Sequence, residues 1–162
     1  MEIIDLKINQ DVEIFSSFYE INQQHVPKVG SVSLEEFINL FQISNISYGF
    51  IKKGIWLGFV ICLRENTNYQ SLNYKFFQKR HKKFFYIDRI AIANKYKSSG
   101  IGSNLYNKLL SIKHEFNIPI CAEVNIDPPN EFSINFHRKH GFSEITESTL
   151  KEGYSVVYME VS

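Results

Sequence analysis

The sequence has little net charge and few cysteines, and these shortages narrow the classes of protein to which it can belong. Its formal net charge is +1 at pH 7, so the chain has no overall field that would attract nucleic acid or a membrane surface. Only two cysteines occur, Cys62 and Cys121, and both stand in apolar stretches typical of strands. We expect two reduced thiols in the core, and a disulfide is the less favoured alternative. No metal site is expected.

Long apolar runs are also missing. No run approaches the roughly 20 residues that a membrane-spanning helix requires. The first ten residues, MEIIDLKINQ, are acidic and lack the apolar stretch and the small-residue cleavage site of a signal peptide. These absences predict a cytoplasmic protein that binds neither a membrane nor nucleic acid.

Aromatic and aliphatic residues, by contrast, are plentiful. Apolar residues make up 44% of the 162, with 14 Phe and 9 Tyr among them, and such a composition argues against intrinsic disorder. This length fits one domain with a sizeable core, and no repeat or low-complexity linker divides it. We therefore expect residues 1–162 to form a single domain.

Hydrophobic periodicity predicts strands and helices along the whole chain. Ser33 and Glu36 are typical of a capping box at a helix start, and Lys53-Gly54 is typical of a tight turn between two strands. We expect an α/β (α+β) fold, with helices on both sides of a mixed sheet and a parallel β-α-β unit in the middle. The predicted helices are 11–25, one that begins after Ser33, one from the turn at 97–102 to about 116, and 131–140. The predicted strands are 2–8, 46–52, 55–64, 84–93, 118–126, 143–147 and 153–161.

A glycine-containing turn lies between the apolar strand 84–93 and the amphipathic helix that follows it. The turn runs from Lys97 to Gly102 and reads KSSGIG. The first amides of a helix lack internal partners and carry the positive end of its dipole, and glycine lets a pyrophosphate approach the backbone. The same residues also fit an ordinary turn. A Walker loop is excluded because Gly-Lys-Ser/Thr is absent, and a dinucleotide fingerprint is excluded because Leu105 replaces its third glycine.

The surroundings of this turn resemble one family. The stretch YIDRIAIANKYKSSGIGSNLYNKLL at 86–110 is similar to the core motif of the GNAT superfamily of N-acetyltransferases. That motif is a strand followed by Arg/Gln-x-x-Gly-x-Gly/Ala and a helix that cradles the pyrophosphate of coenzyme A. The sequence departs from this motif at its first position, where Lys97 replaces Arg or Gln. Lysine supplies a positive charge but lacks the planar guanidinium group of arginine. VNIDPPNEFSINFHRKHGF at 124–142 is similar to the family's next strand, short helix and Gly-Phe ending. The resemblance spans nearly the whole chain and points to a bacterial branch of predicted acetyltransferases.

The resemblance implies a GNAT-like, mostly antiparallel sheet in which strand 84–93 and the next parallel strand splay apart. Acetyl-coenzyme A (acetyl-CoA) is the implied cofactor, with its pantetheine arm between these strands and its diphosphate on the turn. We expect main-chain groups to make most of the contacts. Asn130 suits a helix N-cap, and it is a secondary candidate together with Ser133. The expected coenzyme-binding residues are Ile90, Ala91, Ile92, Lys97, Ser98, Ser99, Gly100, Ile101, Gly102, Asn130 and Ser133.

Acetyl transfer to an amine requires a base that removes a proton from the ammonium. On strand 118–126, Glu123 and Asn125 share one face, and a carboxylate on a central strand requires a polar cleft or a partner. Glu123 is the expected general base, directly or through water, and the alternative is an ion pair with Arg89 or a lysine. Asp88 on the neighbouring strand is a second candidate base or an anchor for the substrate ammonium. Alternatively, Asp88 forms a structural ion pair with a nearby cation.

His137 stands where many GNAT proteins have a tyrosine near the coenzyme sulfur. An imidazole has a pKa of about 6.5 when unperturbed, so it could protonate the departing thiolate as a catalytic acid. It could equally serve as a fixed hydrogen-bond donor or pack beside Phe136. The sequence leaves these roles open.

The segment 65–83 breaks the strand and helix pattern, because it is polar, carries aromatic side chains and ends in KRHKK. It is longer than an ordinary hairpin connection, which favours a functional loop. It could form a wall of the acceptor pocket or a lid packed on the sheet. The expected acceptor-binding residues are Asn125 and, on this segment, Tyr69, Ser71, Asn73, Tyr74 and Phe77.

Together these features predict an N-acetyltransferase that moves an acetyl group from acetyl-CoA to a primary amine by direct transfer in a ternary complex. Two alternatives stay open: a catalytically inactive coenzyme A-binding sensor or interaction module, and an acyltransferase that uses a longer acyl group. The acceptor, a small molecule or a peptide, cannot be read from the sequence. A homodimer and a monomer fit it equally well.

Overall fold

A computed structural model describes residues 2–7 and 11–162. It confirms the predicted order of the seven strands and the four predicted helices, and it adds a helix, α3, that the sequence did not predict. Ile8, the predicted end of the first strand, lies outside the described residues, and β6 extends beyond the predicted 143–147. The elements are β1 (Glu2–Asp5), α1 (Val12–Gln23), α2 (Leu34–Ile43), β2 (Ile46–Lys52), β3 (Ile55–Arg64), α3 (Leu72–Arg80), β4 (Phe85–Ile92), the 3-10 turn η1 (Asn94–Tyr96), α4 (Ile101–Phe116), β5 (Ile120–Asp127), α5 (Glu131–Lys139), β6 (Ser143–Lys151) and β7 (Tyr154–Val161).

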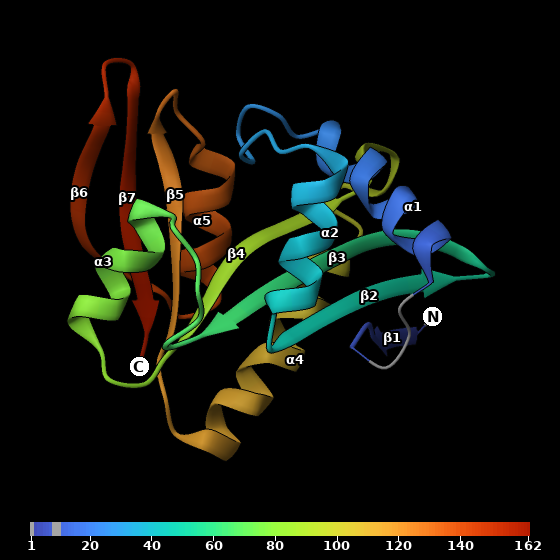
Figure 1. Cartoon of the computed structure of the whole chain (residues 1–162), viewed down its shortest axis with the longest axis horizontal. Helices are drawn as coiled ribbons and strands as arrows, with labels where there is room; N and C mark the ends of the chain where they lie inside the picture. Colours follow the sequence, from blue (N-terminus) through green and yellow to red (C-terminus); the bar gives the residue numbers. More distant parts are fainter. Residues whose placement is uncertain (1, 8–10) are drawn as a thin grey trace.

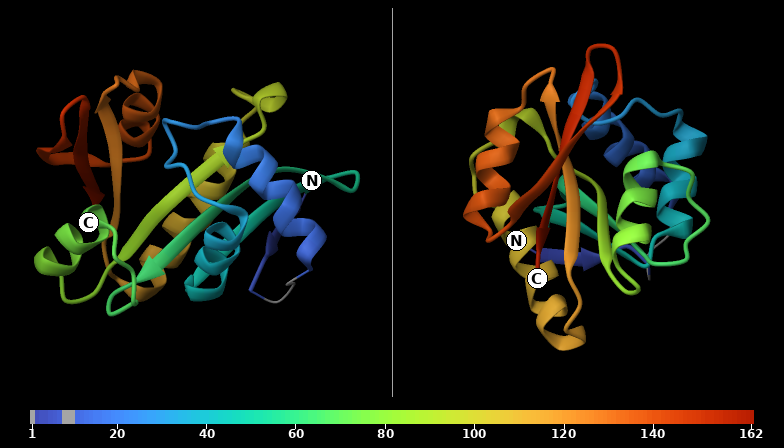
Figure 2. Two further views of the ribbon diagram at one scale, coloured as in Figure 1. Left: turned by 45° about the horizontal axis from the view of Figure 1, so that its top comes forward. Right: turned by 90° about the vertical axis from the view of Figure 1, so that its left-hand side faces the viewer.

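The strands form one seven-stranded sheet in the order β1-β2-β3-β4-β5-β7-β6. Neighbouring strands are antiparallel except β4 and β5, which are parallel and joined through α4. Figures 1 and 2 show two layers of helices, with α1, α2 and α3 over one face and α4 and α5 over the other. The predicted fold class is therefore confirmed. Within the described residues, no helix has the length and apolar character needed to cross a membrane.

Two local sequence signals set element boundaries as predicted. Ser33 and Glu36 make both hydrogen bonds of a capping box at the start of α2, at 3.1 and 2.7 Å. Lys53 and Gly54 connect β2 to β3 with φ angles of 51° and 75°. Positive φ at both positions is what a two-residue type I′ hairpin turn requires.

Apolar side chains pack against both faces of the sheet. Ile87 and Leu105 belong to a cluster beneath α4 and α5. On the opposite face, Phe18 and Phe59 belong to a cluster beneath α1 and α2, and Tyr86 belongs to an aromatic cluster beneath α3. Coverage on both faces explains why the sequences of β3 and β4 are nearly continuously apolar.

The segment 65–83, for which the sequence predicted no helix, contains α3. The hydroxyl of Ser71 caps this helix by accepting a hydrogen bond from the amide of Tyr74 at 3.4 Å. Tyr74 and Phe77 are fully buried and pack against Tyr86 of β4. The segment therefore packs on the sheet as a lid. The helical pattern was missed because it spans only nine residues, and its apolar side is defined by strands far away in the sequence.

β4 and β5 pair only where both strands begin. The register contains two pairs, Phe85 with Ile120 and Tyr86 with Cys121. Beyond them Figure 1 shows β4 leaning away from β5 toward its carboxyl end. The splayed pair that the GNAT resemblance implied is thus present, and it opens toward the turn that precedes α4.

Candidate active site

The turn at 97–102 presents main-chain amides at the start of α4. Gly100 is the N-cap and has a φ of 85°, in the left-handed region that favours glycine. A Cβ built on it would meet no atom within 4 Å. Among the described residues no side chain caps this end, and the first helical hydrogen bond runs from the amide of Asn104 to the Gly100 carbonyl at 3.0 Å. The amides of residues 101–103 therefore lack partners within the helix and can bind an anion.

Gly102 has a different role from the one its place in the turn suggested. A Cβ at this position would lie 3.2 and 3.3 Å from two ring carbons of Phe136. Glycine here permits close packing of α4 on α5, because a side chain would require the Phe136 ring to shift. Lys97, Ser98 and Ser99 are exposed, and the Ser99 hydroxyl donates to a main-chain carbonyl of η1.

The edge of β4 that faces β5 offers main-chain groups at Ile90 and Ile92. The amide of Ala93 donates to the Leu57 carbonyl of β3 at 2.9 Å. In an antiparallel pair, residues alternate between those that bond to the partner strand and those that point away from it. The register therefore engages Ala91 with β3 and turns the polar groups of Ile90 and Ile92 toward the opening. Ala91, expected to bind the coenzyme, has no free main-chain group for that purpose.

His25, which the sequence did not single out, occupies one of these main-chain groups. Its Nε2 lies 2.6 Å from the carbonyl oxygen of Ile92, and it donates because a carbonyl can only accept. Gln24 accepts a hydrogen bond from the amide of Asn94 at 2.8 Å. Both contacts fasten the segment after α1 to the carboxyl end of β4. No local pattern could reveal them, because the His25 contact joins residues 67 positions apart.

Glu123 projects from β5 with its carboxylate enclosed by α3 and β4. Its Oε1 accepts hydrogen bonds from the Asn73 amide at 3.1 Å and from the Tyr86 hydroxyl at 3.0 Å. Its Oε2 is buried and has no partner among the residues that the structure describes. Asn125 follows on the same face of β5, and its Nδ2 is also buried and unpartnered in that part of the chain. An unpaired acceptor and an unpaired donor on one face favour binding of a polar group or water.

The environment of Glu123 suits proton transfer near neutral pH. Burial, and to a lesser extent the charge of Asp88, raise the pKa of Glu123 to about 8, while the hydrogen bonds from Tyr86 and Asn73 act in the opposite direction. A base is most effective when its pKa lies near the working pH. Tyr86 was not predicted, because its place beside Glu123 depends on the parallel register of β4 and β5.

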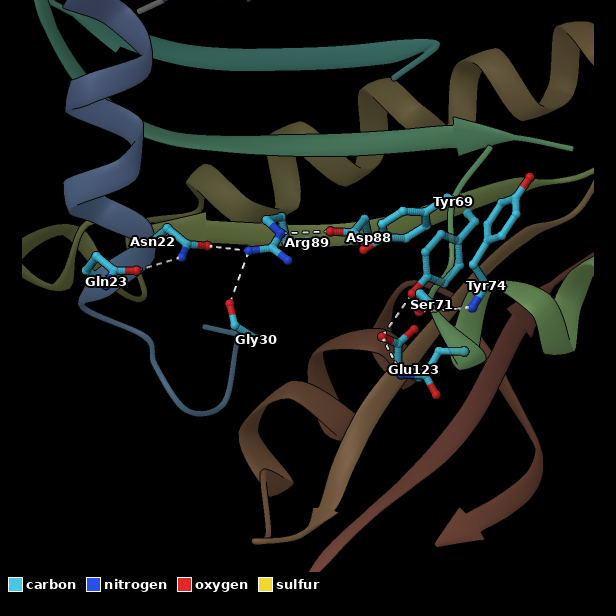
Figure 3. A network of polar contacts seen from close by, with 11 residues as sticks. Asn22, Gln23, Gly30, Tyr69, Ser71, Tyr74, Asp88, Arg89 and Glu123 are labelled. Atoms are coloured by element: carbon cyan, nitrogen blue, oxygen red, sulfur yellow. Dashed lines mark hydrogen bonds and ion pairs between the residues drawn. The ribbon is translucent and has the colours of Figure 1, made fainter. Parts of the chain in front are cut away.

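Asp88 is held in an ion pair. It is the extra residue of a bulge, since the register of β4 with β3 skips it. Arg89 donates from Nε to Asp88 Oδ2 at 2.7 Å, and the Tyr69 hydroxyl donates to Oδ1. Figure 3 shows Arg89 reaching Asp88 on one side and Asn22 and Gly30 on the other. The alternative in which Asp88 pairs with a local cation therefore describes this residue better than a free base. Arg89 is engaged by Asp88, so it is not the ion-pair partner of Glu123.

His137 is buried between α5 and α4. Its Nδ1 lies 2.7 Å from the carbonyl of Ser133, so Nδ1 carries the proton, and its Nε2 accepts from the Tyr106 hydroxyl at 2.7 Å. Burial lowers the pKa of His137 to about 4. A neutral ring with both nitrogens engaged favours a fixed hydrogen-bond donor packed in the core over acid catalysis. Asn130 caps α5 as predicted, because its Oδ1 accepts a hydrogen bond from the amide of Ser133 at 3.4 Å.

The five residues expected to wall the acceptor pocket separate into two groups. Tyr69 and Asn73 reach the two carboxylates described above. Ser71 instead caps α3, and Tyr74 and Phe77 are completely buried. The last three hold the lid on the sheet, whereas Tyr69 and Asn73 are the two that contact the carboxylates of Asp88 and Glu123.

A surface hollow of about 430 Å³ lies elsewhere, between the carboxyl-terminal half of α4 and the strands β2, β3 and β4. Tyr48, Arg64, Lys108 and Phe116 are among its lining residues. Neither the glycine turn nor Glu123 lines it. It contains the carboxylate of Glu115 but no free amide at the start of a helix, so we do not regard it as the active site.

Comparisons with known proteins agree with this geometry. The family model described as the acetyltransferase (GNAT) family matches residues 15–142, and no curated protein matches the sequence. The chain is similar in structure to ribosomal-protein-S18-alanine N-acetyltransferase from Escherichia coli, at 17% identity and a TM-score of 0.70, over 99% of this chain and 92% of that one. It is also similar to Ard1 from Thermoplasma volcanium, at 19% identity and a TM-score of 0.72, over 99% and 95%.

A third similar structure is an aminoglycoside 6'-N-acetyltransferase complexed with coenzyme A, at 12% identity and a TM-score of 0.72, over 99% of this chain and 96% of that one. At such low identities the solved structures establish the fold alone. The family match covers most of the chain, and the splayed strands and the glycine turn supply the matching architecture. The chain belongs to the acetyltransferase (GNAT) family.

Proposed function

We propose that this chain transfers an acetyl group from acetyl-CoA to a primary amine by direct transfer in a ternary complex. The family uses acetyl-CoA, and its members act on amine acceptors. The observation that carries the proposal is the carboxylate of Glu123, which is enclosed beside the opening between β4 and β5. One of its oxygens has no hydrogen-bond partner among the described residues. An amine that entered beneath α3 would find a hydrogen-bond acceptor there.

The glycine turn and the β4 edge fit the coenzyme. Free amides at the start of α4 suit a diphosphate, and the exposed Lys97 adds positive charge. The main-chain groups of β4 that point toward the opening can form hydrogen bonds with the amides of a pantetheine arm, as they would with an added strand. When bound, the coenzyme supplies the acetyl group as a thioester. The residues that would hold it are Ile90, Ile92, Lys97, Ser98, Gly100, Ile101, Gly102, Asn130 and Ser133.

Glu123 acts as the general base in this proposal. In its deprotonated form, Oε2 takes a proton from the substrate ammonium, directly or through one water, and the neutral amine can then attack the thioester carbonyl. The C–S bond breaks, and the second proton that nitrogen loses neutralises the departing thiolate through solvent. Tyr86 and Asn73 hold the other carboxylate oxygen, so the orientation of the base is set before the acceptor arrives. Asn125 offers its unpaired N–H on the same face, where it can orient the acceptor.

The substitution Glu123→Gln tests this role, because the amide keeps the shape of the side chain but cannot accept the proton. We expect thiol release from acetyl-CoA with a panel of primary amines to fall by about 10²–10⁴-fold. Coenzyme A affinity, measured by calorimetry, should change little. The matched control is Glu147→Gln on the exposed side of β6, which should keep wild-type turnover. Unchanged turnover in Glu123→Gln would remove Glu123 as the base.

The same assay separates the alternatives that the sequence left open. A wild-type chain that binds coenzyme A but releases no thiol with any amine would identify a sensor instead of an enzyme. Competition between acyl-coenzyme A esters of increasing chain length would reveal a preference for a longer acyl group.

A further inference from the structure

A second cluster of reactive side chains lies at the closed end of the β4–β5 pair, apart from the glycine turn and the contacts of Glu123. It consists of His81 at the end of α3, Cys121 on β5 and Glu160 on β7. One potential ligand atom of each lies within 4.8 Å of the other two. Cys121 and Glu160 face each other directly in the β5–β7 ladder, so the sheet register fixes their proximity. The end of α3 brings His81 to them.

The cluster is enclosed but reachable from solvent. Cys121 is fully buried, whereas the side chains of His81 and Glu160 are 23% and 12% exposed. Nε2 of His81 lies 2.6 Å from Oε2 of Glu160. Arg80 also binds this carboxylate, from Nη2 to Oε1 at 2.9 Å and from Nε to Oε2 at 3.1 Å. A small ion could therefore enter beside His81.

We propose that His81 Nε2, Cys121 Sγ and Glu160 Oε2 bind Zn²⁺, with water as the fourth ligand. Imidazole, thiolate and carboxylate are the three ligand types that zinc uses in proteins, and a thiolate disfavours Mg²⁺ and Ca²⁺. Zinc–ligand distances of about 2.0–2.3 Å place the ligand atoms of a tetrahedral site about 3.3–3.7 Å apart. The His81 and Glu160 atoms must therefore separate by about 1 Å. This site departs from the expectation of no metal.

Two ligands of the cluster carry negative charge when a divalent ion is bound. Cys121 loses its proton to solvent when the metal binds. Its thiolate and the Glu160 carboxylate then offset the two positive charges of the ion, and the Arg80 guanidinium leaves one positive charge at the edge of the cluster. Arg80 can keep its hydrogen bond to Oε1, which orients the ligating carboxylate from outside, while the metal replaces its bond to Oε2. The bound ion would tie the end of α3 to β5 and β7, and so steady the segment that carries Asn73 over Glu123.

The test uses the full chain without a histidine tag, freed of metal by a chelator and titrated with Co²⁺ as a spectroscopic probe. We expect a thiolate-to-cobalt charge-transfer band that saturates at one equivalent and disappears when Zn²⁺ is added. Cys121→Ser should abolish the band. The matched control Cys62→Ser, which changes the other buried free cysteine, should retain it. His81→Ala should weaken Co²⁺ binding at least about 10-fold, and His114→Ala on the exposed side of α4 should not.

Two results would overturn the zinc site. One is the absence of a charge-transfer band in the wild-type chain, and the other is a band that survives Cys121→Ser. If circular dichroism shows that Cys121→Ser does not fold, His81→Ala decides, because His81 is partly exposed at a helix end and unchanged Co²⁺ affinity contradicts its role. Neither result bears on Glu123, whose test is turnover.

Discussion

The two regions beside the β4–β5 opening are built from different parts of the chain. Coenzyme binding is assigned to main-chain groups, the amides after Gly100 and the β4 edge at Ile90 and Ile92. The region beneath α3 is built from side chains, with Glu123 held by Asn73 and Tyr86. A main-chain site depends on a local backbone conformation, whereas a side-chain site depends on contacts between distant segments.

Gly100→Val should have the largest effect on the main-chain region. A β-branched residue is strained at a φ of 85°, and relief of about 1–3 kcal/mol of strain would move the amides. We expect coenzyme A affinity, measured by calorimetry, to fall about 10–100-fold.

The control for this variant is Gly54→Val in the β2–β3 turn. Gly54 also has a positive φ, 75°, and open space around its Cβ position. Valine at this position therefore introduces similar backbone strain, but away from the opening between β4 and β5 (Figure 1). It should lower Tm without changing affinity. An equal loss of affinity in both variants would point to global destabilisation and count against the turn.

Tyr86→Phe tests the side-chain region through its pH profile. Turnover of the wild type should rise with pH and level off above the Glu123 pKa of about 8, because the base works only when deprotonated. Loss of the Tyr86 hydroxyl removes a donor that favours the charged carboxylate, so the midpoint should rise by about one pH unit. The measurement needs an acceptor amine that stays an ammonium over the whole range, so that the profile reports the ionisation of Glu123. Tyr19→Phe on α1 is the control, and a midpoint that stays or falls would refute the assignment.

The same carboxylate should cost stability at high pH. Its pKa is raised from 4.5 to about 8 in the folded chain, so its favourable contribution is complete below about pH 4.5 and is lost as pH rises through 8. The Tm of the wild type should therefore fall relative to that of Glu123→Gln between pH 5 and 9. Thermal melts of Glu147→Gln should show no such trend. A Tm difference that stays constant with pH would mean that Glu123 ionises normally.

His25→Ala should have the smallest effect, because it alters a single main-chain contact. The imidazole holds the Ile92 carbonyl, which the coenzyme arm would otherwise be free to use. Removing a hydrogen bond worth about 1 kcal/mol should lower the KM for acetyl-CoA about fivefold. His114→Ala serves as the control. A higher KM in His25→Ala would show that the contact supports coenzyme binding instead of competing with it.

The sequence predicted the main-chain region better than the side-chain region, and for a physical reason. A buried strand, a glycine turn and an amphipathic helix are local patterns, so Gly100 could be placed from its neighbours. Asn73 and Glu123 lie 50 positions apart, and their contact depends on α3, a short helix with a weak pattern. The bulge at Asp88 depends on strand register, which hydrophobic alternation does not reveal. The packing of Gly102 against Phe136 could not be foreseen either, because this contact is tertiary.

An electron-density map of crystals soaked in acetyl-CoA tests the central claim most directly. Our account predicts the diphosphate against the amides of residues 101–103, the pantetheine arm along Ile90 and Ile92, and the thioester facing Glu123. A nucleotide bound elsewhere, with no density at the turn around Gly100, would contradict it.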